Sequence, residues 1–211
     1  MATKTKNEET VIEIPKLELK EMALKLIGDS PLIVHAWDEK AKREMLEKQM
    51  KKATSGKKAK DPFSDFCNSL YWLSEKPENP TMEDVMGAKF GFPAVAFKSA
   101  AIDGGFLSGV TSKKTTSRAA FHIIGEMVEV KGIPEMREDM VRIGMGTADI
   151  RYRGEFKEWS VTLLIRYNET AMSAEQIINL FNYGGFGVGV GEWRPAKDGS
   201  YGRFHVATET E

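Results

Sequence analysis

The chain has 211 residues, of which 41% are hydrophobic and 29% charged, and its formal net charge is −1. This composition is typical of a globular protein and excludes a wholly disordered chain. No apolar run approaches the roughly 20 residues of a membrane-spanning helix, and residues 1–10 lack the apolar segment of a signal peptide. The single cysteine, Cys67, can form no internal disulfide, so we expect a cytoplasmic protein in reducing surroundings, with no membrane partner.

The N-terminal part is expected to hold a tail followed by short extended segments. Residues 1–10 are rich in Lys, Glu and Thr and predict a disordered tail. Apolar and charged residues alternate at 11–19, which is typical of an edge strand or an extended arm. Two apolar runs at 22–27 and 32–37 flank a Gly-Asp-Ser-Pro turn at 28–31, and this pattern predicts a strand, a turn and a second strand.

A helical and basic insertion is expected at about 38–90. Apolar residues on one side of 39–52 predict a helix, and the small and basic residues at 53–60 predict an exposed loop. A second helix is expected to begin at Asp61-Pro62 and to continue through Leu73. Thr81 and the acidic residue three positions later indicate the start of a third helix.

The middle of the chain predicts one helix and one strand, separated by loops. Small and apolar residues at 94–105 predict a helix whose end is weakened by glycines. A polar loop is expected at 111–118 and a strand at 119–130, where apolar residues are frequent. Residues 132–142 are expected to form another loop.

The C-terminal part carries the clearest patterns. Paired strands are expected at 147–153 and 158–167, since apolar and polar residues alternate in the second of them. A helix capped by Ser173 is expected to end near Phe181. A glycine-rich loop at 184–191 and a closing strand at 201–206 follow.

The sequence shows no residues arranged for catalysis, so we predict a protein that is not an enzyme. The three histidines, His35, His122 and His205, are far apart, and the last two are expected to be ordinary strand residues. Cys67 lies on an expected apolar helix face, which favours a buried and inert thiol. No spacing typical of a metal site, nucleophile elbow or phosphate-binding loop occurs, so no catalytic residue, metal or cofactor is assigned.

Positive charge is concentrated in one segment despite the balanced total. Residues 40–60 contain nine Lys or Arg and two Glu. Local potential rather than net charge attracts a polyanion, so this segment is a candidate nucleic-acid contact that could close over a strand like a thumb. A solvated helix end is the alternative. The candidate residues are Lys51, Lys52, Lys57 and Lys58.

The most distinctive segment is the glycine-rich one near the C-terminus. A loop without Cβ atoms allows the backbone to approach an anion or another chain closely. Trp193 and Arg194 directly follow the glycines, and Tyr201 and Arg203 lie further along. Aromatic side chains interleaved with arginines are suited to stacking on bases and pairing with phosphates. The alternative is that the aromatic residues are core and the arginines form surface ion pairs.

Two short stretches resemble the CRISPR-associated RAMP superfamily. Gly189–Arg194 has the form Gly-x-Gly-x-x-Arg and is followed by Tyr201-Gly202-Arg203-Phe204, as in the C-terminal glycine loop of that family. Phe92–Lys98 is similar to the entry of the first core helix in the family's backbone subunits, whose lysine region lies near bound RNA. The sequence also looks like uncharacterised phage and prophage proteins, which would place it in a host cytoplasm.

The resemblance implies an α+β fold with a ferredoxin-like (RRM-like) βαββαβ core in one domain at 11–211. It departs from the family pattern at Ser99, where the family has glycine, and at 195–200, which lengthen the glycine loop. The absence of a suitable histidine near the N-terminal strands argues against a repeat-processing endonuclease.

The leading hypothesis is therefore a non-catalytic protein that binds single-stranded RNA or DNA and self-assembles along the strand as a homo-oligomer or filament. Besides the four lysines of the basic segment, the expected contacts are Lys98, Lys113, Lys114, Arg118, Gly189, Gly191, Trp193, Arg194, Tyr201 and Arg203. The alternative is a phage structural protein or host-defence antagonist with the same fold and no nucleic acid. The net charge of −1 and the acidic residues at 135–139 favour this alternative.

Overall fold

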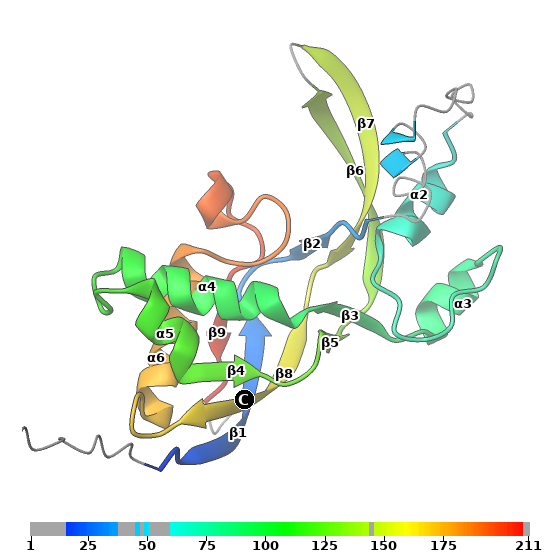
Figure 1. Ribbon diagram of the computed structural model, residues 1–211. Coiled ribbons are helices and arrows are strands. Elements are labelled where there is room, and N and C mark those ends of the chain that lie inside the picture. The colour runs from blue at the N-terminus through cyan, green and yellow to red at the C-terminus, as the bar shows by residue number, and fades with distance from the viewer. Residues whose placement is uncertain (1–15, 38–44, 47–48, 51–59, 144–145, 209–211) are drawn as a thin grey trace, which may run out of the picture.

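The computed structural model describes residues 16–37, 45–46, 49–50, 60–143 and 146–208, and it shows a mixed α+β protein with two antiparallel sheets (Figure 1). The predicted tail at 1–10 lies outside the described residues. So do most of the strand at 11–19, of the helix at 39–52 and of the basic loop at 53–60.

The larger sheet has the strand order β3-β5-β8-β1-β9, and β4 pairs with β8 alongside β5. β8 is central, because it pairs with β1 on one side and with β4 and β5 in succession on the other. The strands are β1 (Leu19–Gly28), β3 (Phe90–Pro93), β4 (Phe121–Ile123), β5 (Met127–Lys131), β8 (Ser160–Asn168) and β9 (Phe204–Val206).

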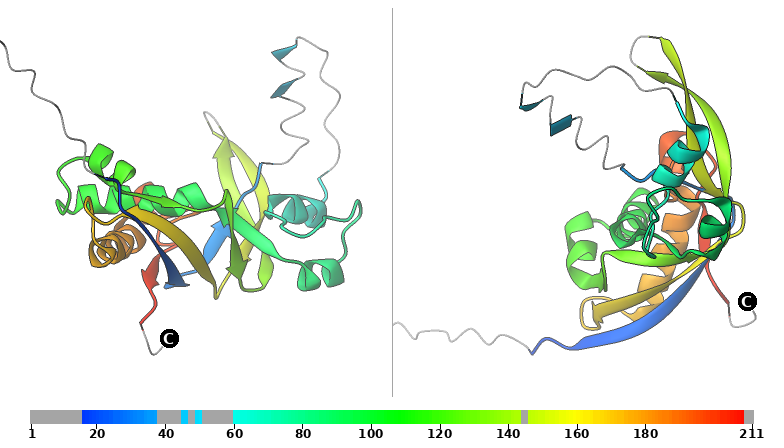
Figure 2. Two further views of the ribbon diagram at one scale, coloured as in Figure 1. Left: turned by 60° about the horizontal axis from the view of Figure 1, so that its bottom comes forward. Right: turned by 90° about the vertical axis from the view of Figure 1, so that its right-hand side faces the viewer.

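Two long helices, α4 (Ala94–Leu107) and α6 (Ala174–Gly187), cover one face of this sheet, and the short α5 (Lys114–Ala120) lies beside them (Figure 2). The sheet face beneath the helices is apolar, since alternate β8 residues from Val161 to Tyr167 are buried and those between them are exposed. Aromatic rings fill the space between the layers, with Phe97 of α4 against both Trp159 and Phe204.

The smaller sheet has the order β2-β7-β6 and carries a long hairpin. Its strands are β2 (Leu32–Val34), β6 (Pro134–Ile143) and β7 (Thr147–Phe156). The β6–β7 hairpin projects from the body of the molecule, as both views show (Figures 1 and 2). α2 (Pro62–Ser69) packs against β7, and α3 (Met82–Gly87) follows it in the chain.

Helix starts were predicted correctly where a capping side chain was visible in the sequence. The Asp61 carboxylate accepts hydrogen bonds from the backbone of Phe63 and Ser64 at the start of α2, both at 3.2 Å. Thr81 forms a reciprocal capping box with the acidic residue three positions on, and Ser173 forms one with Gln176. These caps satisfy backbone N–H groups that the first helical turn leaves unpaired.

The prediction of a loop at 132–142 was wrong from residue 134 onward, because β6 runs from Pro134 to Ile143. Charged residues lie on both faces of this strand, so it lacks the alternation that marks a half-buried strand. The polar loop expected at 111–118 is in part α5. The single strand expected at 119–130 is divided into β4 and β5, with Gly125 between them in the left-handed region at φ 94°.

Strand pairing also differs from the prediction. The two strands expected to pair at 147–153 and 158–167 lie in different sheets, with β7 between β2 and β6 and β8 in the larger sheet. The runs at 22–27 and 32–37 likewise do not pair with each other. The turn between them carries the chain from one sheet to the other, and the Trp159 ring donates a 2.8 Å hydrogen bond to the Ser30 carbonyl there.

Two helix ends were misplaced. The second helix ends at Ser69 rather than running through Leu73. α6 continues to Gly187, so three of the glycines expected in the loop are helical. Within the part of the chain that the structure describes, no helix has both the length and the apolar character needed to cross a bilayer.

Candidate nucleic-acid interface

The glycine loop, defined here as residues 188–203, connects α6 to β9 and contains a short 3-10 helix, Pro195–Lys197. Gly189, Gly191 and Gly202 have φ values of 66°, 78° and 63°. A Cβ at Gly191 would lie 2.5 Å from the Ile33 carbonyl oxygen. These positions therefore require glycine for both their conformation and their close contacts.

Hydrogen bonds attach the glycine loop to the turn at 28–31 and to β2. The Glu192 N–H donates to the Ile33 carbonyl at 3.0 Å, and the Gly202 N–H donates to the Pro31 carbonyl at 2.8 Å. Within the loop, the Val190 N–H donates to the Gly202 carbonyl at 2.9 Å. The loop is thus a fixed part of the fold.

Trp193 occupies a strained backbone position in this loop. Its φ is 53°, a region that non-glycine residues rarely adopt, and 44% of the residue is exposed. The Trp193 carbonyl accepts a 3.1 Å hydrogen bond from the Tyr201 N–H, and Gly199 packs so closely that a Cβ there would lie 1.7 Å from the same oxygen. The surroundings therefore hold the backbone in the strained conformation while the indole remains accessible.

A cavity of about 360 Å³ lies between the glycine loop, the N-terminal half of α4 and the segments that follow β2 and α2. Its aromatic wall contains Tyr71 and Phe92, whose ring centroids are 5.6 Å apart in an edge-to-face arrangement. The residues lining it are His35, Tyr71, Phe92, Pro93, Ala96, Ser99, Ala100, Asp103, Val188, Gly189, Val190, Gly191, Glu192 and Arg194.

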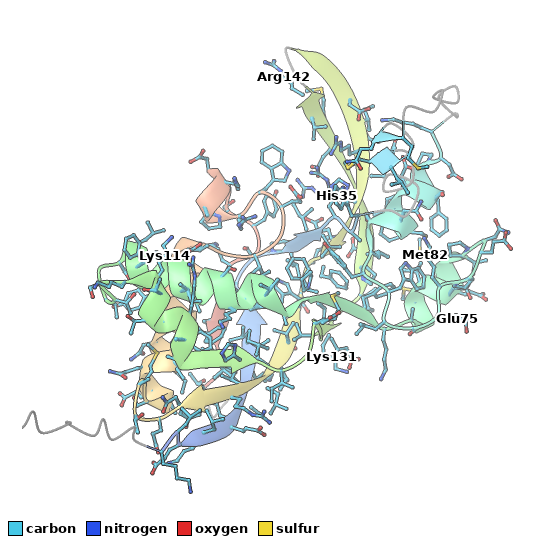
Figure 3. All side chains as sticks on the ribbon, in the orientation of Figure 1. His35, Glu75, Met82, Lys114, Lys131 and Arg142 are labelled. Atoms are coloured by element: carbon cyan, nitrogen blue, oxygen red, sulfur yellow. The ribbon has the colours of Figure 1, made fainter. Side chains whose placement is uncertain are left out.

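The polar groups at this cavity interact with one another. Figure 3 labels His35, which follows β2 near the base of the β6–β7 hairpin. Burial and the nearby Arg153 lower the pKa of His35, partly offset by Glu192. Burial, together with Glu192, raises the pKa of Tyr71, whose hydroxyl donates to the His35 carbonyl at 3.3 Å. Arg194 donates to the Gly191 carbonyl at 2.9 Å, which holds its guanidinium at the cavity wall.

Tyr201 joins the glycine loop to the β6–β7 hairpin through Arg137. The Arg137 guanidinium lies 4.7 Å from the Tyr201 ring centroid and 3.3 Å from its hydroxyl. It also donates to Asp139 and Glu155, both at 2.8 Å. Burial alone would lower the pKa of Arg137, but these hydrogen bonds raise it further above its already high ordinary value. Tyr201 therefore has a structural partner and is not a free stacking surface.

Lys98 and Arg118 meet on the other side of α4. The Lys98 ammonium donates to the Arg118 carbonyl at 3.0 Å, lies 3.2 Å from His122 Nδ1, and is 5.5 Å from the Phe121 ring centroid. Burial and the Arg118 charge lower the pKa of Lys98. A second cavity of about 340 Å³ opens here, lined by Ala94, Val95, Lys98, His122, Ile123, Gly125 and Glu126.

The remaining basic candidates differ in how available they are. Lys114, labelled in Figure 3, pairs with Asp103 at 2.8 Å and lies 5.0 Å from the Phe106 ring, so its charge is partly used within the fold. Lys113 is exposed. Arg203 donates to the Ser200 carbonyl at 3.2 Å. Lys51, Lys52, Lys57 and Lys58 lie outside the described residues.

The structure places four of the predicted residues at two separate cavities, and the other predicted residues that it describes line neither of them. Gly189, Gly191 and Arg194 belong to the first cavity, and Lys98 belongs to the second. Sequence reasoning did not assign His35, Tyr71 or Glu192 to a site, because they come from three distant segments. In the described ranges, no group of three His, Cys, Asp or Glu residues could hold a metal ion.

No protein-family model matches the chain, and no curated protein matches it. Among solved structures, the chain is similar to the crystal structure of Cmr6 from Pyrococcus furiosus. The TM-score is 0.45 with 11% sequence identity, covering 91% of this chain and 100% of that chain.

Proposed function

We propose that the protein is a RAMP-like, non-catalytic protein that binds single-stranded RNA or DNA with its glycine loop and the N-terminal half of α4. In this proposal the core is ferredoxin-like. The six elements of this core, in chain order, are β1, α4, one strand divided into β4 and β5, then β8, α6 and β9. The strand order of the larger sheet and its antiparallel pairing support this assignment.

The observation that carries the proposal is the exposed and strained Trp193. A non-glycine residue in the left-handed region costs about 1–3 kcal/mol and persists where the surroundings enforce it, commonly at ligand sites. The residue is 44% exposed, so part of its surface stays accessible to a ligand. Such a ring is suited to stacking on a base, which contributes about 1–3 kcal/mol per base and tolerates any sequence.

The charges and the cavity beside Trp193 suit the same ligand. Arg194 lies at the wall of the first cavity, and the aromatic residues Tyr71 and Phe92 line it. A strand that stacks on the indole could place a neighbouring base in this cavity, while its backbone crosses α4 towards Lys98 and Arg118. Lys98 and Arg118 would then contact phosphates. Further copies of the protein would occupy the same strand side by side.

The test is fluorescence anisotropy with labelled single-stranded RNA and DNA at about 50 mM and about 200 mM salt. We expect Trp193→Ala to weaken binding about 5-fold to 150-fold with an unchanged salt dependence, because stacking releases no counterions. Lys98→Gln and Arg118→Gln are each expected to weaken binding and to reduce the salt slope by about 0.7.

Lys25→Gln is the matched control, because this substitution removes the same charge as Lys98→Gln. Lys25 is exposed on the sheet face opposite the helices. Loss of binding in Lys25→Gln, with Lys98→Gln unaffected, would place the nucleic acid on the wrong face for this proposal. Salt-insensitive or absent binding at the lower salt concentration would leave a protein-interaction role. Cleavage products abolished by His35→Ala would contradict the non-catalytic assignment.

A further inference from the structure

The longest free strand edge among the described residues belongs to β6. β6 has ten residues and pairs with β7 along its whole length. In the described part of the chain its other edge pairs with nothing. The outer strands β2, β3 and β9 have only three or four residues, and β9 leaves only residues 19–25 of β1 uncovered. Short outer strands limit unwanted pairing, and a long free edge is a template for another strand.

We propose that two copies of this chain associate through β6, pairing antiparallel about a two-fold axis that passes through Met140. The two small sheets then form one continuous six-stranded sheet. The interface is isologous, so each contact occurs twice. This association is independent of nucleic acid and of the proposed function.

The charges of β6 select this register. With Met140 on the axis, Glu138 lies directly opposite Arg142 of the partner subunit, and Arg142 lies opposite the partner's Glu138. Opposite charges at directly facing positions stabilise a sheet, and like charges destabilise it. In an antiparallel pair, directly opposite residues place their side chains on the same face of the sheet. The two-fold axis must therefore pass through a residue, because an axis between two residues would pair neighbours whose side chains lie on opposite faces. Axes through Arg137, Glu138 or Asp139 each place two like charges opposite one another. An axis through Met136 would place Glu135 opposite Arg137 of the partner subunit, but the Arg137 guanidinium is already bonded to Asp139 and Glu155 within one copy.

The exposed apolar side chains of the hairpin agree with the same axis. Met140 is 74% exposed and faces Ile150 of β7, which is 43% exposed. In the paired sheet, the two methionines meet on the axis with an Ile150 on either side, so four apolar residues form one row across four strands. The two charge pairs flank this row. The dimer thereby covers apolar surface that a single copy leaves in water.

Side-chain contacts on the other face of the β6–β7 hairpin fix its position relative to the rest of the fold. On the face opposite Met140, Arg137 donates to Glu155 of β7 and approaches Tyr201 of the glycine loop. Asp139 contacts the buried Arg153 at 3.3 Å. These contacts are made within one copy, and the association leaves them in place. Figure 3 labels Arg142 near the free end of the hairpin, where a partner has access.

The first test measures the mass of the full chain by light scattering across a dilution series without nucleic acid. We expect a dimer for the native chain, and dimer affinity at least about 10-fold weaker for Glu138→Arg and for Arg142→Glu, because each creates two like-charge pairs. The double variant Glu138→Arg/Arg142→Glu should restore the dimer. An equimolar mixture of the two single variants should form a heterodimer, since each supplies the charge that the other requires.

A monomer at all concentrations would overturn the proposal, as would single reversals that dimerise like the native chain. The second test fixes the axis by oxidation. Met140→Cys should form a disulfide-linked dimer, because the two residues meet on the axis. Met136→Cys is the matched control. It lies on the same face, but its two copies would be about 27 Å apart at 3.4 Å per residue.

Cys67 is fully buried and does not compete in this reaction. Efficient cross-linking of Met136→Cys, or none of Met140→Cys, would refute this register.

Discussion

Gly104 of α4 and Gly184 of α6 meet where the two helices cross. A Cβ at Gly104 would lie 2.4 Å from the Gly184 nitrogen, and a Cβ at Gly184 would lie 2.6 Å from the Ala100 carbonyl carbon. The backbones of the two helices are therefore in direct contact. This contact sets the distance between the helices that carry the first cavity, since α4 forms one wall and the glycine loop begins at the end of α6.

Gly184→Ala tests this crossing. We expect it to lower the free energy of unfolding by about 1–3 kcal/mol, because an added methyl group at a backbone contact forces the helices apart. Chemical denaturation followed by circular dichroism measures the change. Gly187→Ala is the control in the same helix, since a Cβ there meets nothing within 4 Å. It should leave stability unchanged or raise it slightly, and equal losses in both variants would contradict the close crossing.

The same glycines show where prediction from sequence ended. The helix start at Ser173 could be predicted because its cap partner, Gln176, lies three residues away. The end of α6 could not, because Gly184 and Gly185 normally favour a loop. At these helical positions the residues must be glycine, because Ala100 and Phe204, distant in sequence, leave no room for a Cβ. Short-range patterns predict local structure, whereas these glycines are explained only by tertiary contacts.

β8 and β6 illustrate the same limit for strands. β8 buries one face against the helices, so its alternating residues predicted it. β6 was missed because one face carries Arg137 and Asp139, which pair beneath the glycine loop, and the other carries Glu138 and exposed methionines. The glycine-loop residues of the site were visible in the sequence. Their neighbours His35 and Tyr71 required the fold to bring them there.

Two substitutions of Trp193 should differ in stability but weaken binding equally. Trp193→Gly and Trp193→Ala both remove the indole, but only glycine adopts the φ of 53° without strain. We therefore expect the glycine variant to be more stable than the alanine variant by about 1 kcal/mol, with equally weakened nucleic-acid binding. Thermal denaturation and anisotropy measure the two effects. An alanine variant at least as stable as the glycine variant would show that the backbone position is not strained.

His35 should make stability depend on pH. Its pKa in the folded protein is below the ordinary value of 6.5, chiefly because of burial and then because of Arg153. The unfolded chain then binds more protons between the two pKa values, so His35 contributes stability above about pH 6.5 that is lost as the pH falls below it. We expect His35→Gln to reduce the decrease in melting temperature between neutral and mildly acidic pH.

The control for this pH dependence is His122→Gln, which changes an exposed histidine. The effect is assigned to His35 if His35→Gln reduces the decrease in melting temperature more than His122→Gln does. If His35→Gln retained the full decrease, another group would have to be responsible.

Arg153 and Asp139 should respond unequally to substitution, although they contact each other. Arg153 is 4% exposed, and its Nε finds no hydrogen-bond partner among the described residues. Asp139 has a second cation, because Arg137 donates to it at 2.8 Å. Asp139→Asn leaves a buried arginine without its carboxylate and is expected to cost about 3 kcal/mol, whereas Arg153→Met leaves Asp139 paired and is expected to cost about 1 kcal/mol or less. Urea denaturation of the two variants measures this difference, and the reverse order would show that Arg153 is balanced by a group other than Asp139.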